Sequence, residues 1–175
     1  MPEFNLGFSE KLIEAAKVIK NSHMKDLDGK RTVLYLSLLS IEISLKSIME
    51  KAGISISKIK TLSHNHKKLL EELEIKCEIE VEIATGTFRW LPCSRLRAVT
   101  VDTSFSNATI GVLLQAETTG ASSYPNQIRY GSNLQHYPPE VMLEAAEKLL
   151  GWVKEFLVPQ QNLWVTLGVG RSPSA

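Results

Sequence analysis

Cysteine is scarce in this sequence, and charge of neither sign dominates it. The chain has two cysteines among 175 residues, Cys77 and Cys93, which is too few for a disulfide framework. We therefore expect a reducing, cytoplasmic setting. The formal net charge is +1, so the overall charge favours neither nucleic acid nor a membrane surface as a partner. Any electrostatic recognition must come from local groups.

Several sequence signals of targeting and of known sites are missing as well. The opening residues, MPEFNLGFSEKL, lack a basic stretch followed by a long apolar run, so we expect no signal peptide. The chain shows no glycine-rich phosphate loop, nucleophile elbow or G-x-G-x-x-G fingerprint. The apolar run after Arg31 is interrupted, and we expect it to be too short to span a bilayer. With 43% hydrophobic and 22% charged residues, the composition is that of a globular protein with its own core.

Helical periodicity is clear in the first part of the chain. Apolar residues recur at spacings of three and four over residues 8–22, which predicts a helix with Ser9 as its N-cap and Ala15 on its apolar stripe. A second helix is predicted over about residues 30–52, followed by Gly53 in the C′ position that favours glycine. This second segment is apolar on almost every side, so we expect it to lie at the centre of a helical bundle.

Two further helices are predicted later in the chain. A short one covers HKKLLEELEI, residues 66–75, with Ser63 or Asn65 as its cap, and the polar stretch before it is expected to be a connection. The last helix is predicted over about residues 139–157. Residues 159–175 are expected to form an irregular tail.

Between these two helices the hydrophobic period changes to that of a strand. Residues 75–83 alternate strictly between apolar and polar side chains. Further strands are predicted over residues 94–102 and 108–117, which would complete a small antiparallel sheet. The alternative is that the preceding helix continues through residues 75–83, because glutamate favours helix. Residues 118–137 contain many turn-forming residues and are expected to form a loop.

Two charged features are candidate site residues. Glu42 and Lys46 stand four residues apart on the apolar second helix, and they form either a simple helical ion pair or part of a site. The second feature is a cluster of basic residues without an acid, at the start of the short helix, where an anion would be stabilised by the helix N-terminus. The alternative is a solvated basic turn. The cluster comprises Lys58, Lys60, His64, His66, Lys67 and Lys68.

A zinc site is a weaker interpretation of the same histidines. His64 and His66 could be combined with Cys77 or Cys93, but the spacing is not that of a zinc module. Cys77 also falls on the apolar side of its predicted strand. We therefore expect no metal and no cofactor.

The helical parts of the sequence resemble the HEPN superfamily, named for nucleotide binding in higher eukaryotes and prokaryotes. The stretch SIEISLKSIME is similar to the E-x-x-(x)-L-K element that members often carry on their second helix, with Glu42 and Lys46 as its charged residues. The stretch HNHKKL resembles the H-D-L-x-x-L start of the third helix, with Asn65 in place of Asp and His66 in place of Leu. The segment QIRYGSN, followed by proline and EAAEKLL, resembles the end of many members. Residues 75–117 lie outside the likeness.

The resemblance implies an up-down helical bundle that is commonly a homodimer. Here that bundle would be a single domain over residues 1–158, mainly α, with a small antiparallel β insertion at about residues 75–117, and so α+β overall. Many members are metal-independent endoribonucleases with an R-x(4–6)-H motif, in which arginine stabilises the charge on the phosphorane and histidine acts as a general base.

Arg129 and His136 have the spacing R-x6-H and are the catalytic pair that the resemblance implies. The pattern departs from the family in that Tyr130 occupies the position where a polar residue usually follows the arginine. Gly131 and Ser132 favour a loop, and the prolines after Tyr137 place His136 just before the last helix. The alternative is that Arg129 and Tyr130 anchor the loop onto the bundle.

Three functions follow from these features. The first is a nucleotide- or RNA-binding protein. The second is an endoribonuclease, the toxin of a toxin–antitoxin or defence system, whose partner would be a cognate antitoxin or a nucleotidyltransferase-type protein. The third is a non-catalytic dimeric scaffold whose β insertion binds another protein. No membrane partner is expected. The residues expected to bind an anion or nucleotide are His64, His66, Lys67, Lys68, Glu42, Lys46 and Tyr130.

Overall fold

Helices form most of the described chain in the computed structural model, as the periodicity predicts. The structure describes residues 2–23, 26–76, 78–84, 87–101, 108–116, 124–130 and 136–157. Some sequence predictions lie outside these residues: the placement of Cys77, the predicted loop at residues 118–123 and 131–135, and the irregular tail over residues 159–175.

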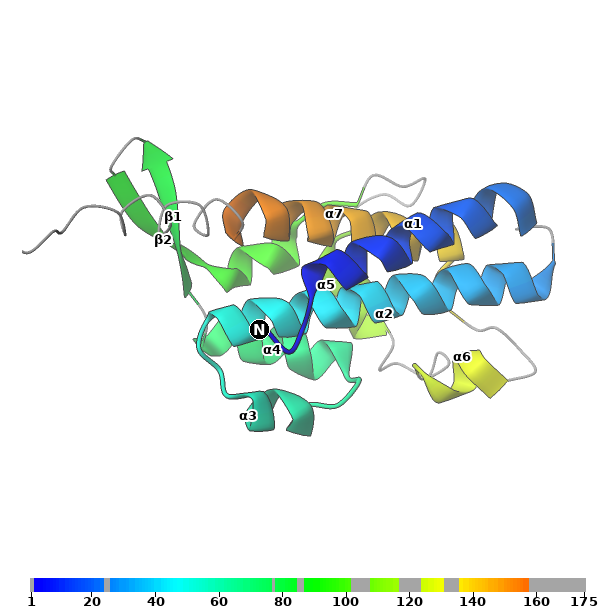
Figure 1. Cartoon of the computed structure of the whole chain (residues 1–175), viewed down its shortest axis with the longest axis horizontal. Coiled ribbons are helices and arrows are strands. Elements are labelled where there is room, and N and C mark those ends of the chain that lie inside the picture. The colour runs from blue at the N-terminus through cyan, green and yellow to red at the C-terminus, as the bar shows by residue number, and fades with distance from the viewer. Residues whose placement is uncertain are drawn as a thin grey trace, which may run out of the picture.

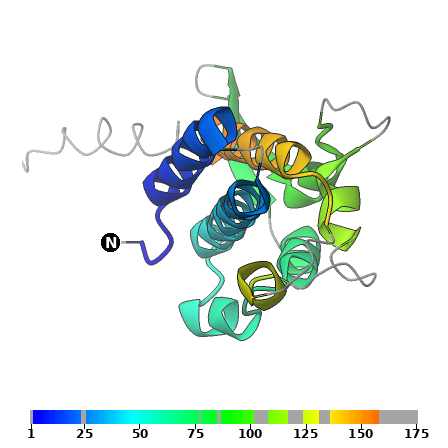
Figure 2. The ribbon, with the colours of Figure 1, turned by 90° about the vertical axis from the view of Figure 1, so that its right-hand side faces the viewer.

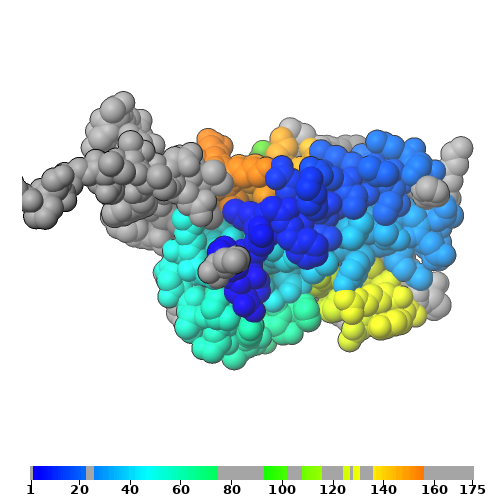
Figure 3. All heavy atoms as spheres, in the orientation of Figure 1, coloured from blue at the N-terminus to red at the C-terminus, as the bar shows by residue number. Residues whose placement is uncertain are grey.

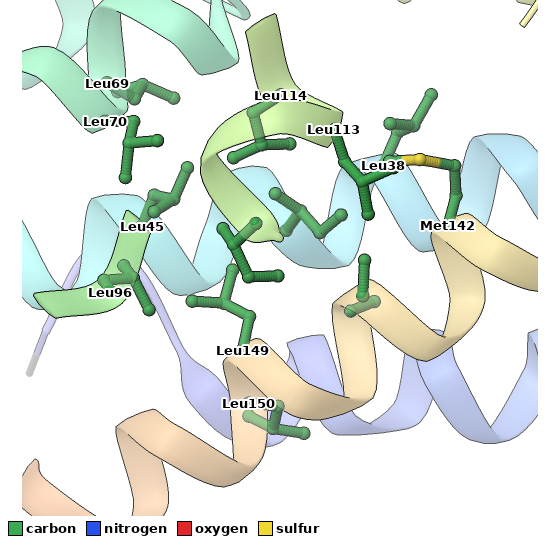
Figure 4. Packing of buried hydrophobic residues seen from close by; sticks show 14 of the residues in the cluster. Leu38, Leu45, Leu69, Leu70, Leu96, Leu113, Leu114, Met142, Leu149 and Leu150 are labelled. Carbon is green, nitrogen blue, oxygen red and sulfur yellow. The ribbon is translucent and has the colours of Figure 1, made fainter. Parts of the chain in front are cut away.

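The longest helix, α2 (Leu27–Lys51), lies at the centre of the fold, as predicted. On one side it packs against α1 (Leu6–His23) and α7 (Pro139–Leu157), which also contact each other. Figure 2 looks nearly along α2 and shows these two helices together on one side of it. Leucines from α2, α4, α5 and α7 meet in the core, among them Leu45 and Leu149 (Figure 4).

Three shorter helices pack on the other side of α2 and bring the candidate site residues to it. They are α3 (Ile56–Thr61), α4 (His66–Lys76) and α6 (Asn126–Tyr130). Figure 1 shows α3 and α6 below α2. The stretch of α3 was predicted to be a connection and that of α6 a loop; both are short helices instead. In α3, Ser55 caps the first turn and Ile59 is buried, so one core contact and one cap suffice to order it.

Capping residues explain where α2 begins and ends. It begins earlier than predicted because the carboxylate of Asp26 accepts a hydrogen bond from the Gly29 N–H. At its end Gly53 adopts a positive φ of 82°, as its C′ position predicts. The Gly53 N–H donates to the Glu50 carbonyl and the Ile54 N–H to the Met49 carbonyl, which is a Schellman motif.

The length of α2 contradicts the expectation that the apolar run is too short to span a membrane. By length and composition alone it could cross one. However, 67% of its most apolar 18-residue window is buried inside the fold. That burial is what the central helix of a bundle requires, so the length of α2 is explained by the bundle core.

A row of buried serines joins α1 to α2, and it corrects two predictions for α1. Ser9 is not the N-cap: it is buried within the helix, and its hydroxyl lies 2.7 Å from the Ser40 Oγ and 2.8 Å from the Ser44 Oγ. The helix begins after Asn5, whose side chain accepts a hydrogen bond from the Gly7 N–H. Ala15, predicted on the inner stripe, is exposed. The serines decide which side of α1 faces inward, because buried hydroxyls must find partners.

The region after α4 differs from the predicted three-stranded sheet. It contains an antiparallel hairpin of β1 (Glu78–Ala84) and β2 (Thr87–Pro92). The predicted strand over residues 94–102 is instead a 3₁₀ helix, Cys93–Ala98, and the one over residues 108–117 is α5 (Ile110–Ala116). Both predicted strands were wrong because short apolar runs fit either period, and burial against neighbouring helices decides between them. In α5, the buried hydrophobic side chains follow a helical spacing: Ile110, Leu113 and Leu114.

Candidate functional site

The candidate site is built on the side of α2 that faces α4 and α6. Tyr35, Glu42 and Lys46 are spaced by seven and four residues, which places them along one side of the helix. Helices α4 and α6 contact α2. His64, in the turn before α4, and Tyr124, in the segment of residues 124–125 before α6, contact Glu42 and Tyr35 on that side. Most of the residues that the sequence singled out therefore come together along one stripe of α2.

Glu42 and Lys46 form the buried ion pair that their spacing predicts. The Lys46 Nζ lies 2.7 Å from the Glu42 Oε1, and the two residues are only 7% and 4% exposed. The ring of Phe4, from the segment before α1, lies 5.5 Å from the same Nζ. In Figure 3 that segment crosses the surface of α2 toward α3. A charged pair buried this deeply needs further hydrogen bonds to satisfy the remaining carboxylate lone pairs.

His64 supplies one of those hydrogen bonds. Ser63 adopts a left-handed φ of 54°, and Asn65 caps α4 by accepting the Lys68 N–H at 2.9 Å. Between them, His64 is turned toward α2, with its Nδ1 2.9 Å from the Glu42 Oε2. An ionised carboxylate can only accept, so the Nδ1–H donates. The His64 side chain is 51% exposed, and Nε2 is therefore the ring nitrogen left for a ligand.

Tyr124, which sequence reasoning missed, is the third partner of Glu42. Burial, the charge of Glu42 and a hydrogen bond to Glu42 all raise the pKa of the Tyr124 hydroxyl well above its usual range. The hydroxyl therefore stays protonated and donates to the carboxylate. Its ring stacks on the His66 ring at 4.9 Å and meets the His64 ring edge-on at 6.0 Å. Its position in a predicted loop carried no signal of burial.

The buried surroundings of Glu42, together with Lys46 and His64, determine the charge state of Glu42. Burial alone raises the pKa of a carboxyl group. The hydrogen bonds and positive charges of Lys46 and His64 more than offset this effect, so the pKa of Glu42 lies below its usual value. Glu42 is thus ionised, and its carboxylate accepts hydrogen bonds from Lys46, His64 and Tyr124. These bonds fix the positions of the three side chains.

His66 lies inside the fold, although it was predicted to bind an anion. It is fully buried, and its Nε2 lies 3.0 Å from the Leu38 carbonyl oxygen. Because a carbonyl oxygen only accepts, the Nε2–H is the donor. Its role in the structure is to anchor the start of α4 to α2.

Arg129 lies on α6 and reaches Tyr35 on α2. Its Nε donates to the Tyr35 hydroxyl at 3.0 Å, and its Cζ lies 4.9 Å from the centre of the Tyr35 ring. The Tyr35 ring in turn lies 5.8 Å from the Tyr124 ring. The two tyrosines therefore connect Arg129 with the group around Glu42. Tyr130, the next residue, is 80% exposed.

The basic cluster at the start of α4 is not free of acids in three dimensions. Three of its lysines have carboxylate partners, Glu72, Glu3 and Glu71, which are distant in sequence or one helical turn away. The pairs are Lys58–Glu72 at 4.0 Å, Lys60–Glu3 at 2.8 Å and Lys67–Glu71 at 3.8 Å. Lys68 is exposed. The charge that this face offers to an anion is therefore smaller than the sequence cluster implies.

His136 lies just before α7, half-buried, with its ring edge-on to Tyr137 at 6.2 Å. Residues 131–135, which join it to α6, are outside the described part of the chain. Arg129 contacts Tyr35, and the ring of His136 contacts that of Tyr137. The catalytic Arg129–His136 pair stays a prediction from spacing.

Metal ligands do not gather in the part of the chain that the structure describes, where no group of three or more His, Cys, Asp and Glu side chains is arranged for a metal ion. Cys93, one of the residues considered for zinc, is buried in the core.

Comparisons with known protein families, curated proteins and solved structures find no match for this chain. Its function must therefore be argued from the chemistry of the site.

Proposed function

We propose that this protein is a HEPN-like nucleotide- or RNA-binding protein whose site lies between α2, the turn before α4, and α6. In this proposal the helical bundle is the HEPN-like domain and the β hairpin is an insertion in it. The observation that carries the proposal is one connected group of side chains. Glu42 holds the half-exposed His64, and Tyr124 and Tyr35 link both to the exposed Arg129.

The exposed members of this group have the chemistry that single-stranded nucleic acid requires. Arg129 is a permanent cation that can bind a phosphate oxygen with its guanidinium group. Tyr130, beside it on α6, offers an exposed ring on which a base can stack. In Figure 3, α6 adjoins the region of α3 and α4 on one surface of the molecule. A strand lying on α6 would thus pass close to the turn that carries His64.

Fluorescence anisotropy with a labelled single-stranded oligoribonucleotide at low salt tests this proposal. We expect Arg129→Ala to weaken binding by about ten- to a hundredfold, because it removes a charge-assisted hydrogen bond. Loss of stacking in Tyr130→Ala costs about 1–3 kcal/mol. Arg95→Ala, which changes an exposed arginine of the 3₁₀ helix, is the matched control and leaves the affinity unchanged.

No binding by the wild type, or equal losses in Arg129→Ala and Arg95→Ala, would remove the proposal. Because phosphate binding releases counterions, the affinity should also fall as salt is raised. Light scattering on the same samples measures whether the protein is the homodimer that the resemblance implies.

The metal-independent endoribonuclease is the second candidate function, and one observation favours it. A carboxylate that holds Nδ1 of a histidine, with an arginine nearby, is an arrangement used for acid–base catalysis. RNA cleavage in EDTA, measured for the wild type, His136→Ala and His64→Ala, tests it. Absence of cleavage by the wild type would exclude this activity. Loss in only one variant would identify the histidine that acts with Arg129.

A further inference from the structure

We propose that Lys60 is a phosphate-binding residue of the proposed site and that the strap, residues 3–5, competes with the ligand for it. The strap presents the Glu3 carboxylate at the place where a phosphate oxygen of the ligand would bind. This inference rests on the proposed RNA- or nucleotide-binding function and deepens it, because it adds a binding residue and an intramolecular inhibitor to the same site.

One carboxylate of α2 holds the strap. The N–H groups of Glu3 and Phe4 donate to the two oxygens of Glu50, at 2.9 and 3.0 Å. The Phe4 ring lies 5.5 Å from the Lys46 Nζ and packs against the hydrophobic core. These contacts place Glu3 beside α3, where its carboxylate lies 2.8 Å from the Lys60 Nζ. The strap therefore keeps a negative charge on Lys60.

The strap lies at one end of the stripe of α2 that carries the site. Glu50 is four residues beyond Lys46, which is itself four residues beyond Glu42, so the three side chains follow one another along one side of the helix. Glu42 is also the carboxylate that holds His64. Figure 3 shows the strap, α3 and α6 on the same face of the molecule. An oligonucleotide lying on this face can therefore contact both α3 and α6.

Lys60 differs from the other paired lysines of this face in where its partner lies. Lys58 and Lys67 pair with glutamates of α4, a helix that is packed on α2. Glu3 instead precedes α1, and the side chains of Glu3 and Lys60 are 48% and 61% exposed. Water screens an exposed pair of this kind and can replace either partner. A phosphate can therefore displace Glu3 without moving a helix.

The strap can leave its place while α1 stays fixed. The Ser9 hydroxyl binds those of Ser40 and Ser44, which attaches α1 to α2. Asn5, whose side chain accepts a hydrogen bond from the Gly7 N–H, marks the boundary between the strap and the helix. Opening therefore breaks the contacts of the strap and leaves the bundle intact.

The competition is between two anions for one cation. A hydrogen bond from Lys60 and the charge of Lys60 lower the pKa of Glu3, so Glu3 is ionised at neutral pH. A ligand that uses Lys60 must displace this carboxylate, and its apparent affinity falls by the fraction of molecules in which Lys60 is available. For an exposed ion pair the effect corresponds to about two- to fivefold in affinity.

Fluorescence anisotropy with a labelled single-stranded 2′-O-methyl oligouridylate tests the competition. It is measured at neutral pH and about 0.1 M salt, where charges more than about 10 Å apart are largely screened. Glu3→Gln removes the competing charge and should tighten binding about two- to fivefold. Phe4→Ala changes no charge but loosens the strap, so it should tighten binding by a smaller factor. The matched controls on α1, Glu14→Gln and the exposed Phe8→Ala, should leave the affinity unchanged.

The double variant Glu3→Gln with Lys60→Ala assigns the effect to Lys60. Removing the carboxylate helps the ligand only if the lysine is there to bind it. Glu3→Gln should therefore tighten binding in the wild type and have no effect when Lys60 is already alanine. A gain of the same size in both backgrounds would contradict the role of Lys60.

The outcomes separate this inference from the proposed function. An affinity that is unchanged in Glu3→Gln or in a folded Phe4→Ala, or a gain in Glu14→Gln as large as that in Glu3→Gln, would overturn the inference while leaving RNA binding intact. If neither the wild type nor any variant bound the oligonucleotide, the proposed function would fall and the inference with it. If circular dichroism shows that Phe4→Ala does not fold, Glu3→Gln and its combination with Lys60→Ala decide the question, because both side chains lie at the surface.

Discussion

At the scale of single residues, Glu42 organises the site. Its carboxylate accepts hydrogen bonds from Lys46, His64 and Tyr124, which come from three separate parts of the chain. A buried ion pair is not by itself a large source of stability, because desolvation offsets much of the attraction. Glu42 instead fixes the positions of its partners. A substitution that removes the carboxylate would break the hydrogen bonds to His64, in the turn before α4, and to Tyr124, just before α6.

Replacing Glu42 should be strongly destabilising. Glu42→Gln leaves the Lys46 ammonium buried without its counter-charge, and we expect a loss of about 3–5 kcal/mol in the free energy of unfolding. Urea unfolding followed by circular dichroism measures it. The double variant Glu42→Leu with Lys46→Met should recover only part of the loss, because it removes both charges but leaves the Tyr124 hydroxyl and His64 without their acceptor. Glu14→Gln, which breaks the exposed pair with Lys11, is the control, with an effect of about 0–1 kcal/mol. Similar losses for both single variants would contradict this role.

Glu42 should also make the folded state sensitive to acid. Its pKa in the folded protein lies below the usual 4.5, so below that pH the unfolded chain binds a proton more readily than the folded one. The stability contributed by Glu42 is therefore fully present above about pH 4.5 and is lost as the pH falls through its folded pKa. Urea unfolding at a series of pH values from 7 down to 3 should show a steeper loss for the wild type than for Glu42→Leu with Lys46→Met. Parallel profiles would show that Glu42 is not responsible.

At the scale of elements, close contacts determine where the short helices lie. Arg97 in the 3₁₀ helix pairs with Glu74 of α4, with an Nη2–Oε2 distance of 2.9 Å, and its side chain lies against Gly111 of α5. The missing side chain at Gly111 lets α5 approach the 3₁₀ helix. This contact helps to explain why the region forms helices and not the strands that the alternation of residues predicted.

Gly111→Ala should therefore disturb this contact. The added Cβ would lie 2.1 Å from the Arg97 Cγ and 3.1 Å from the Arg97 carbonyl oxygen. Because the backbone oxygen cannot move aside easily, we expect a loss of about 1–3 kcal/mol in thermal or urea unfolding.

Gly151→Ala provides the matched control. Gly151 lies on the exposed side of α7, and a Cβ there would meet nothing within 4 Å. It should raise stability by about 0.5–1 kcal/mol, because alanine favours helix more than glycine. A neutral Gly111→Ala would mean that α5 and the 3₁₀ helix move apart without cost.

At the scale of the whole molecule, burial is concentrated on α2. This helix contacts α1 and α7 on one side and α3, α4 and α6 on the other. The short helices α3 and α6 touch it from outside and are mostly exposed. The candidate site therefore joins the most buried helix to α6, one of the least buried ones, which gives the site a rigid base and an accessible edge.

Hydrogen exchange should reflect this arrangement. Amides in the middle of α2 should exchange only on global unfolding, whereas those of α3 and α6 should open locally and exchange much faster. Mass spectrometry of peptides covering the three helices measures the difference. Addition of a bound oligonucleotide should slow exchange in α6 more than in α7. Equal protection of α3, α6 and α2 would contradict the predicted order.

The sequence by itself determined those features that depend only on the spacing of residues close together in the chain. The apolar periodicity was enough to predict α1, α2, α4 and α7, and Gly53 marked the end of α2 because few other residues adopt a positive φ. The Glu42–Lys46 pair could also be predicted, since residues four apart on a helix are neighbours whatever else the chain does.

Contacts between distant parts of the chain were decided only by the tertiary structure. Tyr35 and Tyr124 carried no signal in sequence, yet together they connect Arg129 to Glu42. The sequence shows no acidic partner close to the lysines near α4, and the fold places glutamates beside them. The apolar run at residues 110–116 forms a helix because its apolar side chains are buried at helical spacing. Each of these outcomes depends on which surfaces become buried together, and a linear pattern carries no information about its partners until the chain has folded.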